Sequence, residues 1–130
     1  MFDGFDHTKY KDEVTERWGR DAYERSDNWW RRLSEHERKA FMQEQADIAR
    51  DFGAARAAGQ AADSDEVQAI TARHHTWLGR AAEQVSKEYF TGLGEMYVAD
   101  PRFTANYDKH GEGTAILIRD AMRVYADRNL

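Results

Sequence analysis

The sequence predicts a single all-α domain. The 130 residues include only one proline, and helix-forming residues such as alanine, glutamate and arginine are abundant. The apolar residues recur at the three- and four-residue spacing of helices rather than in the alternation typical of strands. A chain of this length can bury roughly two-thirds of its unfolded surface in one core without disulfides or metals. We therefore expect one helical domain.

Two short helices are predicted at the N-terminus. The first carries Tyr10 and Trp18 on one stripe, and Asp21 is expected to be the N-cap of the second. The second helix has Trp29 on its apolar stripe and Trp30 beside it. Consecutive helical side chains diverge by about 100°, so the two tryptophans cannot both point into one narrow core. One of them is expected to cover something other than the core.

A long helix and a partner helix follow. Ser34 and Glu37 form an S-x-x-E capping box at the start of the long helix, which ends before the loop "GQAADSD". Ser64 begins the partner helix. Its apolar stripe consists of Val67, Ile70, His74, Trp77, Leu78 and Ala81. His74 thus lies on the stripe, whereas His75 does not.

Three more helices complete the predicted fold. The apolar stripe of the first consists of Val85, Tyr89, Leu93, Met96 and Tyr97. This helix also contains Gly92 and Gly94, which cost about 1 kcal/mol each relative to alanine and so predict a very close contact. A short helix from Pro101 presents Phe103 and Tyr107 four residues apart. The last helix is expected to be central to the core and to bury Leu117, Ile118, Ala121, Met122 and Tyr125.

The composition excludes several classes of function. A net charge of −5 argues against nucleic-acid binding by this chain alone, because such binding needs a basic patch. The absence of cysteine removes disulfides, thiolate metal sites and thiol nucleophiles, and it fits a cytoplasmic location. No apolar run approaches the roughly 18 residues of a membrane span, and the N-terminus does not resemble a secretory signal. We expect a cytoplasmic protein that does not bind membranes.

Neither a metal nor a cofactor is expected. His74 and His75 are adjacent and diverge by about 100° on a helix, so they do not form an i, i+4 chelating pair. Asp108 and His110 have the residue types of an acid–base pair, but no nucleophile or oxyanion-stabilising group accompanies them. We therefore do not expect an enzyme, and His74 is interpreted as a hydrogen-bonded histidine of a cleft or of the core.

Four motifs together carry a resemblance to a known family. They are the run "RWGRDAY" at residues 17–23, the loop "AAGQAADSDE" at 57–66, the histidine pair after it, and "LGEMYVADPRFTANYD" at 93–108. In this order and over nearly the whole chain, the sequence resembles the TipAS antibiotic-recognition domain. That domain is the C-terminal effector half of some MerR-family transcriptional regulators.

The resemblance implies a globin-like helical fold without haem, whose cleft binds bulky, largely apolar, multi-ring antibiotics such as thiopeptides. It also implies that residues 1–33 form an aromatic-rich segment that can be mobile and close over the ligand, while residues 34–130 form the helical core. The DNA-binding half of a full regulator would have to be encoded upstream. The chain is thus expected to be either a stand-alone drug-binding protein or an excised effector domain.

One departure from the family qualifies this comparison. Thiopeptide-binding members carry a cysteine on the helix before the "LGEMY" motif, able to attack a dehydroalanine of the drug, and Val85 stands at the corresponding position here. Capture of a ligand by a thiol is therefore excluded, and binding is expected to be non-covalent.

The candidate binding residues are mainly aromatic, because rigid rings offer large surfaces for stacking flat heterocycles. The set consists of Trp18, Tyr23, Trp29, Trp30, His74, Trp77, Tyr89, Phe90, Leu93, Tyr97, Phe103 and Tyr107. Each of these aromatics could equally belong to the core, since aromatic stripes usually do. The alternative function is a protein-interaction module, in which the same aromatics dock a partner helix.

Overall fold

A computed structural model of the protein describes residues 20–82 and 84–130, without the side chains of residues 20–23 and 26. Within these residues every regular element is a helix, which confirms the predicted all-α class. None of the described helices is both long and apolar enough to cross a membrane. The predicted first helix, with Tyr10 and Trp18, lies outside the described residues.

The first two described helices meet at a capping box. Helix α2 spans Arg20–Arg32, so Asp21 lies within the helix and the prediction that it is the N-cap was wrong. Helix α3 spans Glu35–Ala57. Ser34 Oγ accepts a hydrogen bond of 3.1 Å from the Glu37 amide, and the Ser34 amide donates one of 2.9 Å to Glu37 Oε1. This reciprocal pair satisfies two donors at the helix start, as the S-x-x-E motif predicted.

Serine caps also begin the next two helices. Helix α4 spans Asp65–Ala81 with Ser64 as its N-cap, as predicted. Helix α5 spans Lys87–Ala99, and the Ser86 hydroxyl accepts a hydrogen bond from the Tyr89 amide at 3.1 Å. The prediction that Val85 is part of this helix was therefore wrong, because Val85 precedes the cap, although its side chain is buried.

The chain ends in a short helix and a longer one. Helix α6 spans Pro101–Asp108, with Asp100 as its N-cap and proline in its first turn. Helix α7 spans Thr114–Asn129 and buries Ile118, Ala121 and Met122 completely. Leu117 and Tyr125 were predicted to be buried but are half-exposed, because they lie at the edge of the buried face.

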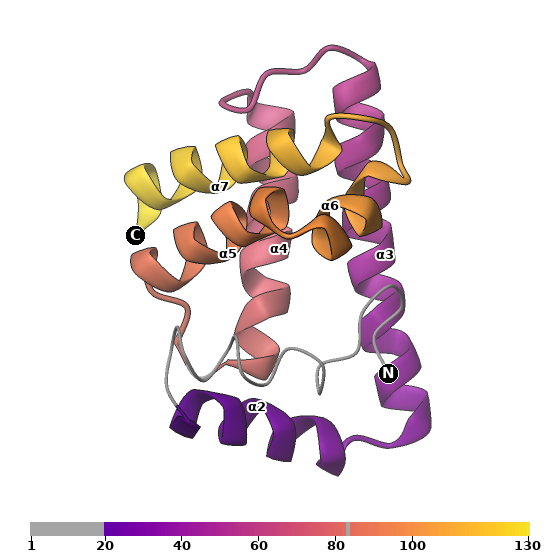
Figure 1. Ribbon diagram of the computed structural model, residues 1–130, viewed down its shortest axis with the longest axis vertical. Helices are drawn as coiled ribbons and strands as arrows, with labels where there is room; N and C mark the ends of the chain where they lie inside the picture. Colours follow the sequence, from indigo (N-terminus) through magenta and orange to yellow (C-terminus); the bar gives the residue numbers. More distant parts are fainter. Residues whose placement is uncertain (1–19, 83) are drawn as a thin grey trace.

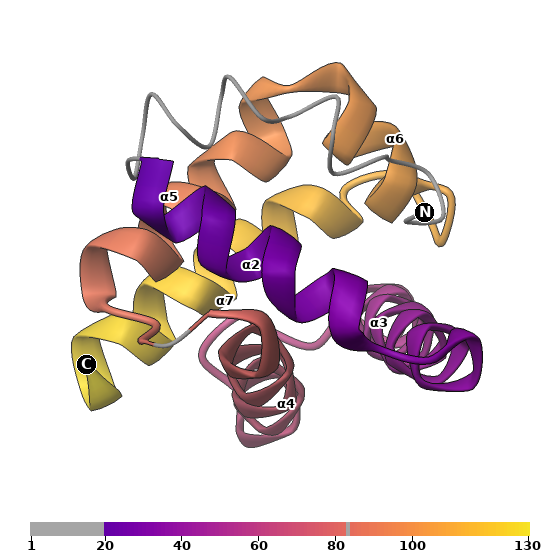
Figure 2. The ribbon, with the colours of Figure 1, turned by 90° about the horizontal axis from the view of Figure 1, so that it is seen from below.

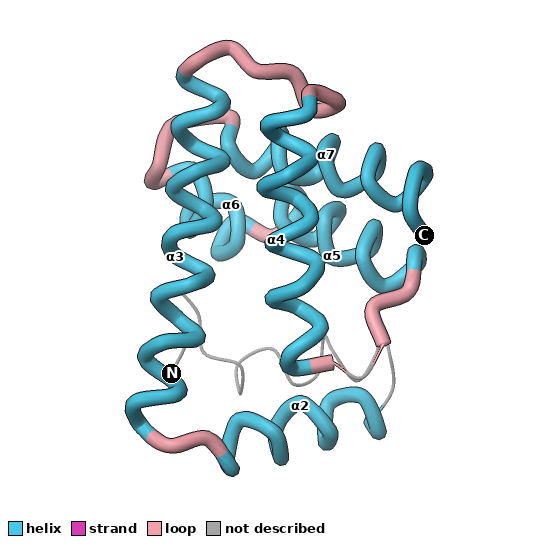
Figure 3. The backbone as a smooth tube through the Cα atoms, turned by 180° about the vertical axis from the view of Figure 1, so that it is seen from behind, coloured by secondary structure: helices cyan, strands magenta, loops and turns pink. Residues whose placement is uncertain are grey.

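The helices form two layers closed at one end by α2. Helices α3 and α4 lie side by side, and α5, α6 and α7 pack behind them (Figure 3). Helix α2 crosses the lower ends of α3 and α4 (Figure 1), and the view from below shows it running across that end of the molecule (Figure 2).

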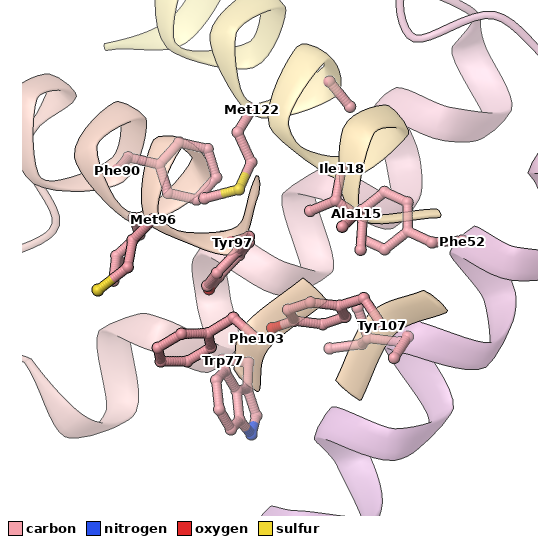
Figure 4. Packing of buried hydrophobic residues seen from close by; sticks show 14 of the residues in the cluster. Phe52, Trp77, Phe90, Met96, Tyr97, Phe103, Tyr107, Ala115, Ile118 and Met122 are labelled. Atoms are coloured by element: carbon pink, nitrogen blue, oxygen red, sulfur yellow. The ribbon is translucent and has the colours of Figure 1, made fainter. Parts of the chain in front are cut away.

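The close contact predicted from glycine is present where α5 meets α7. A Cβ atom at Gly94 would lie 3.4 Å from both the Cα of Arg119 and the Sδ of Met122. Contacts of this length are tighter than most Cβ contacts, so glycine allows the two helices to approach. Figure 4 shows the core that results, with Phe90 and Met122 on one side of Tyr97 and Phe103, Tyr107 and Trp77 on the other.

Candidate functional site

The adjacent tryptophans at the end of α2 have different environments. Trp30 is buried, at 6% exposure, whereas Trp29 is half-buried. The sequence predicted Trp29 on the buried stripe and Trp30 beside it, and this was wrong, because Trp30 is the more deeply buried of the two. Both rings contact Phe41 of α3 edge-on, with ring centroids 4.8 Å away for Trp29 and 6.2 Å for Trp30. Two large aromatic surfaces thus converge on one phenyl ring.

Arg38 holds this end of α2 against α3. Its Nε donates a hydrogen bond of 3.1 Å to the carbonyl of Trp30, and Nη2 donates one of 3.2 Å to the carbonyl of Arg31. These carbonyls belong to the last turn of α2, which has no further helical amides to bond. The guanidinium also lies 5.3 Å from the Trp30 ring centroid, within the range of a cation–π contact. Arg38 therefore fastens the end of α2 to the first turns of α3.

Behind the tryptophan pair lies a stack of three rings. Phe41 and Trp77 are nearly parallel, with centroids 4.4 Å apart and an interplanar angle of 19°. Trp77 is in turn nearly parallel to His74, at 5.9 Å and 13°. The indole Nε1 of Trp77 donates a hydrogen bond of 2.9 Å to the Phe41 carbonyl, which pins α4 to α3. These rings are fixed in orientation before any ligand arrives.

His74 links this stack to the tyrosines of α5 and α6. It is 1% exposed, and its Nε2 lies 3.0 Å from the Tyr97 hydroxyl in a hydrogen bond. Tyr97 contacts Tyr107 and Phe103, with ring centroids 4.7 Å and 5.6 Å away. The result is a continuous row of rings, which we call the aromatic column. It comprises Trp29, Trp30, Phe41, Trp77, His74, Tyr97, Phe103 and Tyr107.

Burial keeps the titratable members of the column uncharged. Desolvation, with a smaller effect from neighbouring His75, lowers the pKa of His74 to about 3. Burial raises the pKa of Tyr107 to about 12 and that of Tyr97 well above its usual value. A neutral imidazole and two neutral phenols are therefore present at physiological pH. The column provides apolar surface and neutral hydrogen-bonding groups, with no charge to drive chemistry.

The remaining predicted site residues do not all join the column. Phe90 is fully buried on the side of α7, where its ring contacts His75 and Tyr125 at 5.2 Å and 5.6 Å, and it borders the column through His74 at 6.3 Å. Leu93 is buried in the same core, and Tyr89 is half-buried with its pKa raised by burial. Trp18 and the side chain of Tyr23 lie outside the described residues, so the structure does not place them.

Sequence reasoning missed three residues that border this region. Phe41 was not among the candidate binding residues, although its ring joins the tryptophan pair to Trp77. Gln45 and Asn106 are buried amides, exposed by 4% and 5%. The sequence spacing could have identified both amides. Gln45 follows Phe41 by four residues and Asn106 follows Phe103 by three. Each polar residue therefore occupies a position on an apolar stripe of its helix.

Asp108 and His110, the candidate acid–base pair, contribute to helix capping and to packing. Asp108 Oδ1 accepts a hydrogen bond of 2.9 Å from the Ala115 amide and thereby caps the start of α7, where Gly113 offers no side chain. His110 instead packs against Gly53 of α3, and desolvation lowers its pKa. Among the described residues, no group of three or more His, Asp or Glu side chains could hold a metal ion.

The chain is similar over nearly its whole length to known proteins. The sequence matches the TipAS antibiotic-recognition domain over residues 10–125. The HTH-type transcriptional activator TipA of Streptomyces coelicolor is 35% identical over 130 residues, which covers 99% of this chain and 51% of TipA. The HTH-type transcriptional regulator SkgA of Caulobacter vibrioides is 33% identical over 138 residues, covering 97% of this chain and 52% of SkgA. The chain thus spans about half the length of these curated relatives.

A solved structure is also similar. TipAS from Streptomyces lividans, determined in complex with the thiopeptide antibiotic nosiheptide, is 36% identical and matches with a TM-score of 0.82. The match covers 95% of this chain and 87% of the other. It confirms the expected globin-like helical fold.

Proposed function

The chain belongs to the TipAS antibiotic-recognition domain family, and on this premise we propose that it binds bulky multi-ring antibiotics through the aromatic column. The observation that carries the proposal is the column itself, in a chain whose fold matches that of a protein solved with nosiheptide. Rigid, pre-stacked rings lose little conformational entropy when a flat heterocycle packs on them. In the cell the chain would act as the drug-sensing part of a regulator or as a protein that sequesters the drug.

Binding in this proposal is non-covalent. The sequence has no cysteine, and lysine amines are mostly protonated near neutral pH, so the chain lacks a soft nucleophile for a dehydroalanine. Affinity would come from burial of apolar ring surface and from a few hydrogen bonds. The relatives are named as transcriptional regulators, which agrees with a binding role and not with catalysis.

We also propose that residues 1–33 act as a lid over the column. Trp30, Phe41 and Trp77 are nearly buried without a ligand, so a drug can reach their faces only if α2 moves. Support comes from the modest anchoring of α2, since Trp30 alone is buried among the α2 side chains that the structure describes. The edge contacts of Trp29 and Trp30 with Phe41 contribute about 0.5–1.5 kcal/mol each beyond the burial of surface area. This is small compared with the free energy of micromolar ligand binding, roughly 8 kcal/mol.

A titration with nosiheptide tests the proposed function. Tryptophan fluorescence and calorimetry should both report saturable binding, and mass spectrometry of the denatured mixture should show only the unmodified 15.1 kDa chain. Trp29→Leu should raise the dissociation constant about tenfold, since a lost aromatic contact is worth on the order of 1.4 kcal/mol. Ile116→Ala is the control, because Ile116 is 49% exposed on α7 and should leave binding unchanged. Failure of the wild-type chain to bind would refute the proposal.

A further inference from the structure

The interior holds two amide side chains whose NH₂ groups have no hydrogen-bond partner within the described part of the chain. Gln45 Nε2 and Asn106 Nδ2 are both fully shielded from solvent, and neither meets an acceptor in good hydrogen-bond geometry, although Gln45 lies close enough to the Tyr107 hydroxyl to offset part of the rise that burial causes in its pKa. Among the described residues, Arg56 Nε, Gln68 Oε1, His74 Nδ1 and His110 Nε2 are likewise buried without a partner. Other buried polar atoms do have partners. Thr71 bonds the Val67 carbonyl at 2.7 Å, Thr114 bonds the Gly111 carbonyl at 2.6 Å, and His74 bonds Tyr97. Gln45 and Asn106 are therefore the buried side-chain amides whose NH₂ groups are unsatisfied.

An unpaired buried amide lowers the stability of the folded protein, and an apolar residue at the same position would not. A buried donor without an acceptor destabilises a protein, because it has given up its hydrogen bond to water without replacing it. Leucine at position 106 or methionine at position 45 would fill nearly the same volume without that penalty. The proposed function supplies a state, the ligand-bound protein, in which acceptors of a ligand can reach these amide groups.

Both amides lie beside the aromatic column. Gln45 is one helical turn after Phe41 on α3, and its side chain lies next to that of Tyr107. Asn106 shares the buried side of α6 with Phe103 and Tyr107. Since α3 and α6 contact each other, the two amides and the rings of the column belong to one region of the interior.

We propose that Gln45 and Asn106 determine ligand specificity by donating hydrogen bonds to carbonyl oxygens or ring nitrogens of an amide-containing, multi-ring ligand. This inference rests on the proposed function and adds the polar part of the recognition. The column selects for flat apolar rings, whereas the two donors select for rings that carry acceptors. A ligand of the same shape without acceptors leaves both donors unpaired and binds more weakly.

The experiment uses the full chain with nosiheptide as the probe. Gln45→Met and Asn106→Leu remove the donors at nearly constant volume. Gln68→Met is the matched control, because Gln68 Nε2 already donates to the carbonyls of Ala62 at 2.7 Å and Ala121 at 3.1 Å. Two quantities are measured for each variant, the dissociation constant for nosiheptide and the midpoint of thermal unfolding without ligand.

The two measurements distinguish a role in ligand binding from a role in the stability of the fold. We expect Gln45→Met and Asn106→Leu each to raise the dissociation constant about tenfold while leaving the unfolding midpoint unchanged or higher. Gln68→Met should do the reverse, lowering the midpoint without changing the dissociation constant. Wild-type affinity in both donor variants would overturn the inference and leave the proposed function standing. So would a fall in their midpoints equal to that of Gln68→Met, because the amides would then have partners within the folded chain.

The proposed function fails in a different way. If the wild-type chain does not bind nosiheptide, the variants have no affinity to lose, and both the function and the inference built on it are refuted. A loss confined to the donor variants supports the inference.

Discussion

Acidification from pH 7 to pH 5 is expected to destabilise the folded protein through His74. In the folded chain burial holds the pKa of this imidazole at about 3, whereas in the unfolded chain it returns to about 6.5. Below pH 6.5 the unfolded state therefore binds a proton that the folded state does not. The stabilising contribution of the neutral imidazole is complete above pH 6.5 and is lost progressively as the pH falls toward 3.

The size of the effect follows from the two pKa values. At pH 5 the unfolded histidine is about 1.5 pH units below its pKa, while the folded one is still neutral. At 1.36 kcal/mol per unit, this corresponds to about 2 kcal/mol of lost unfolding free energy. That is a large share of the 5–15 kcal/mol typical of a small domain.

Urea unfolding at the two pH values, followed by circular dichroism, measures this loss. His74→Gln removes the titrating group, and its amide can still bond the Tyr97 hydroxyl. The wild-type chain should lose about 2 kcal/mol more than this variant between pH 7 and pH 5. The same substitution at His36, which is exposed, should leave the wild-type dependence intact. Equal pH dependence in the wild-type and His74→Gln chains would refute the reasoning.

Two further predictions concern packing and capping. Gly53→Ala should cost about 1–3 kcal/mol, because its Cβ would lie 2.6 Å from the Cβ and 2.8 Å from the carbonyl oxygen of His110. Gly79→Ala, where the new Cβ meets nothing within 4 Å, should instead stabilise the chain by about 1 kcal/mol, and chemical denaturation of both variants compares them. Asp108→Ala should lower stability by about 1 kcal/mol, since it removes the acceptor for the Ala115 amide. An unchanged denaturation midpoint for Asp108→Ala would show that this cap is not needed.

Most helix boundaries could be predicted because they depend on local chemistry. Ser34, Ser64 and Asp100 each have a side-chain oxygen that caps the following amides, and short-range spacing is enough to recognise them. Ser86 is a cap of the same kind, and overlooking it placed Val85 inside α5. At α5 the nearer capping residue had thus been available in the sequence.

The candidate site was less predictable, because it depends on contacts between distant residues. Trp30, the inward tryptophan, contacts residues of the next helix, where Arg38 bonds its carbonyl and Phe41 meets its ring. Helical periodicity within α2 contains no information about those contacts. Gln45 and Asn106 were missed for a related reason, since an isolated polar residue on an apolar stripe resembles the edge of the buried face until the packing is known.

The indole N–H signals of a ¹⁵N-labelled chain offer the most direct test of ligand binding at the aromatic column. The chain has four tryptophans, and Trp29, Trp30 and Trp77 all belong to the column. Saturation with nosiheptide should shift the indole signals of these three residues, because aromatic rings stacked beside them change the local field. Backbone amides on the exposed side of α7, around Ile116, should stay in place. Unchanged tryptophan signals at saturating drug, or shifts confined to α7, would contradict binding at the column.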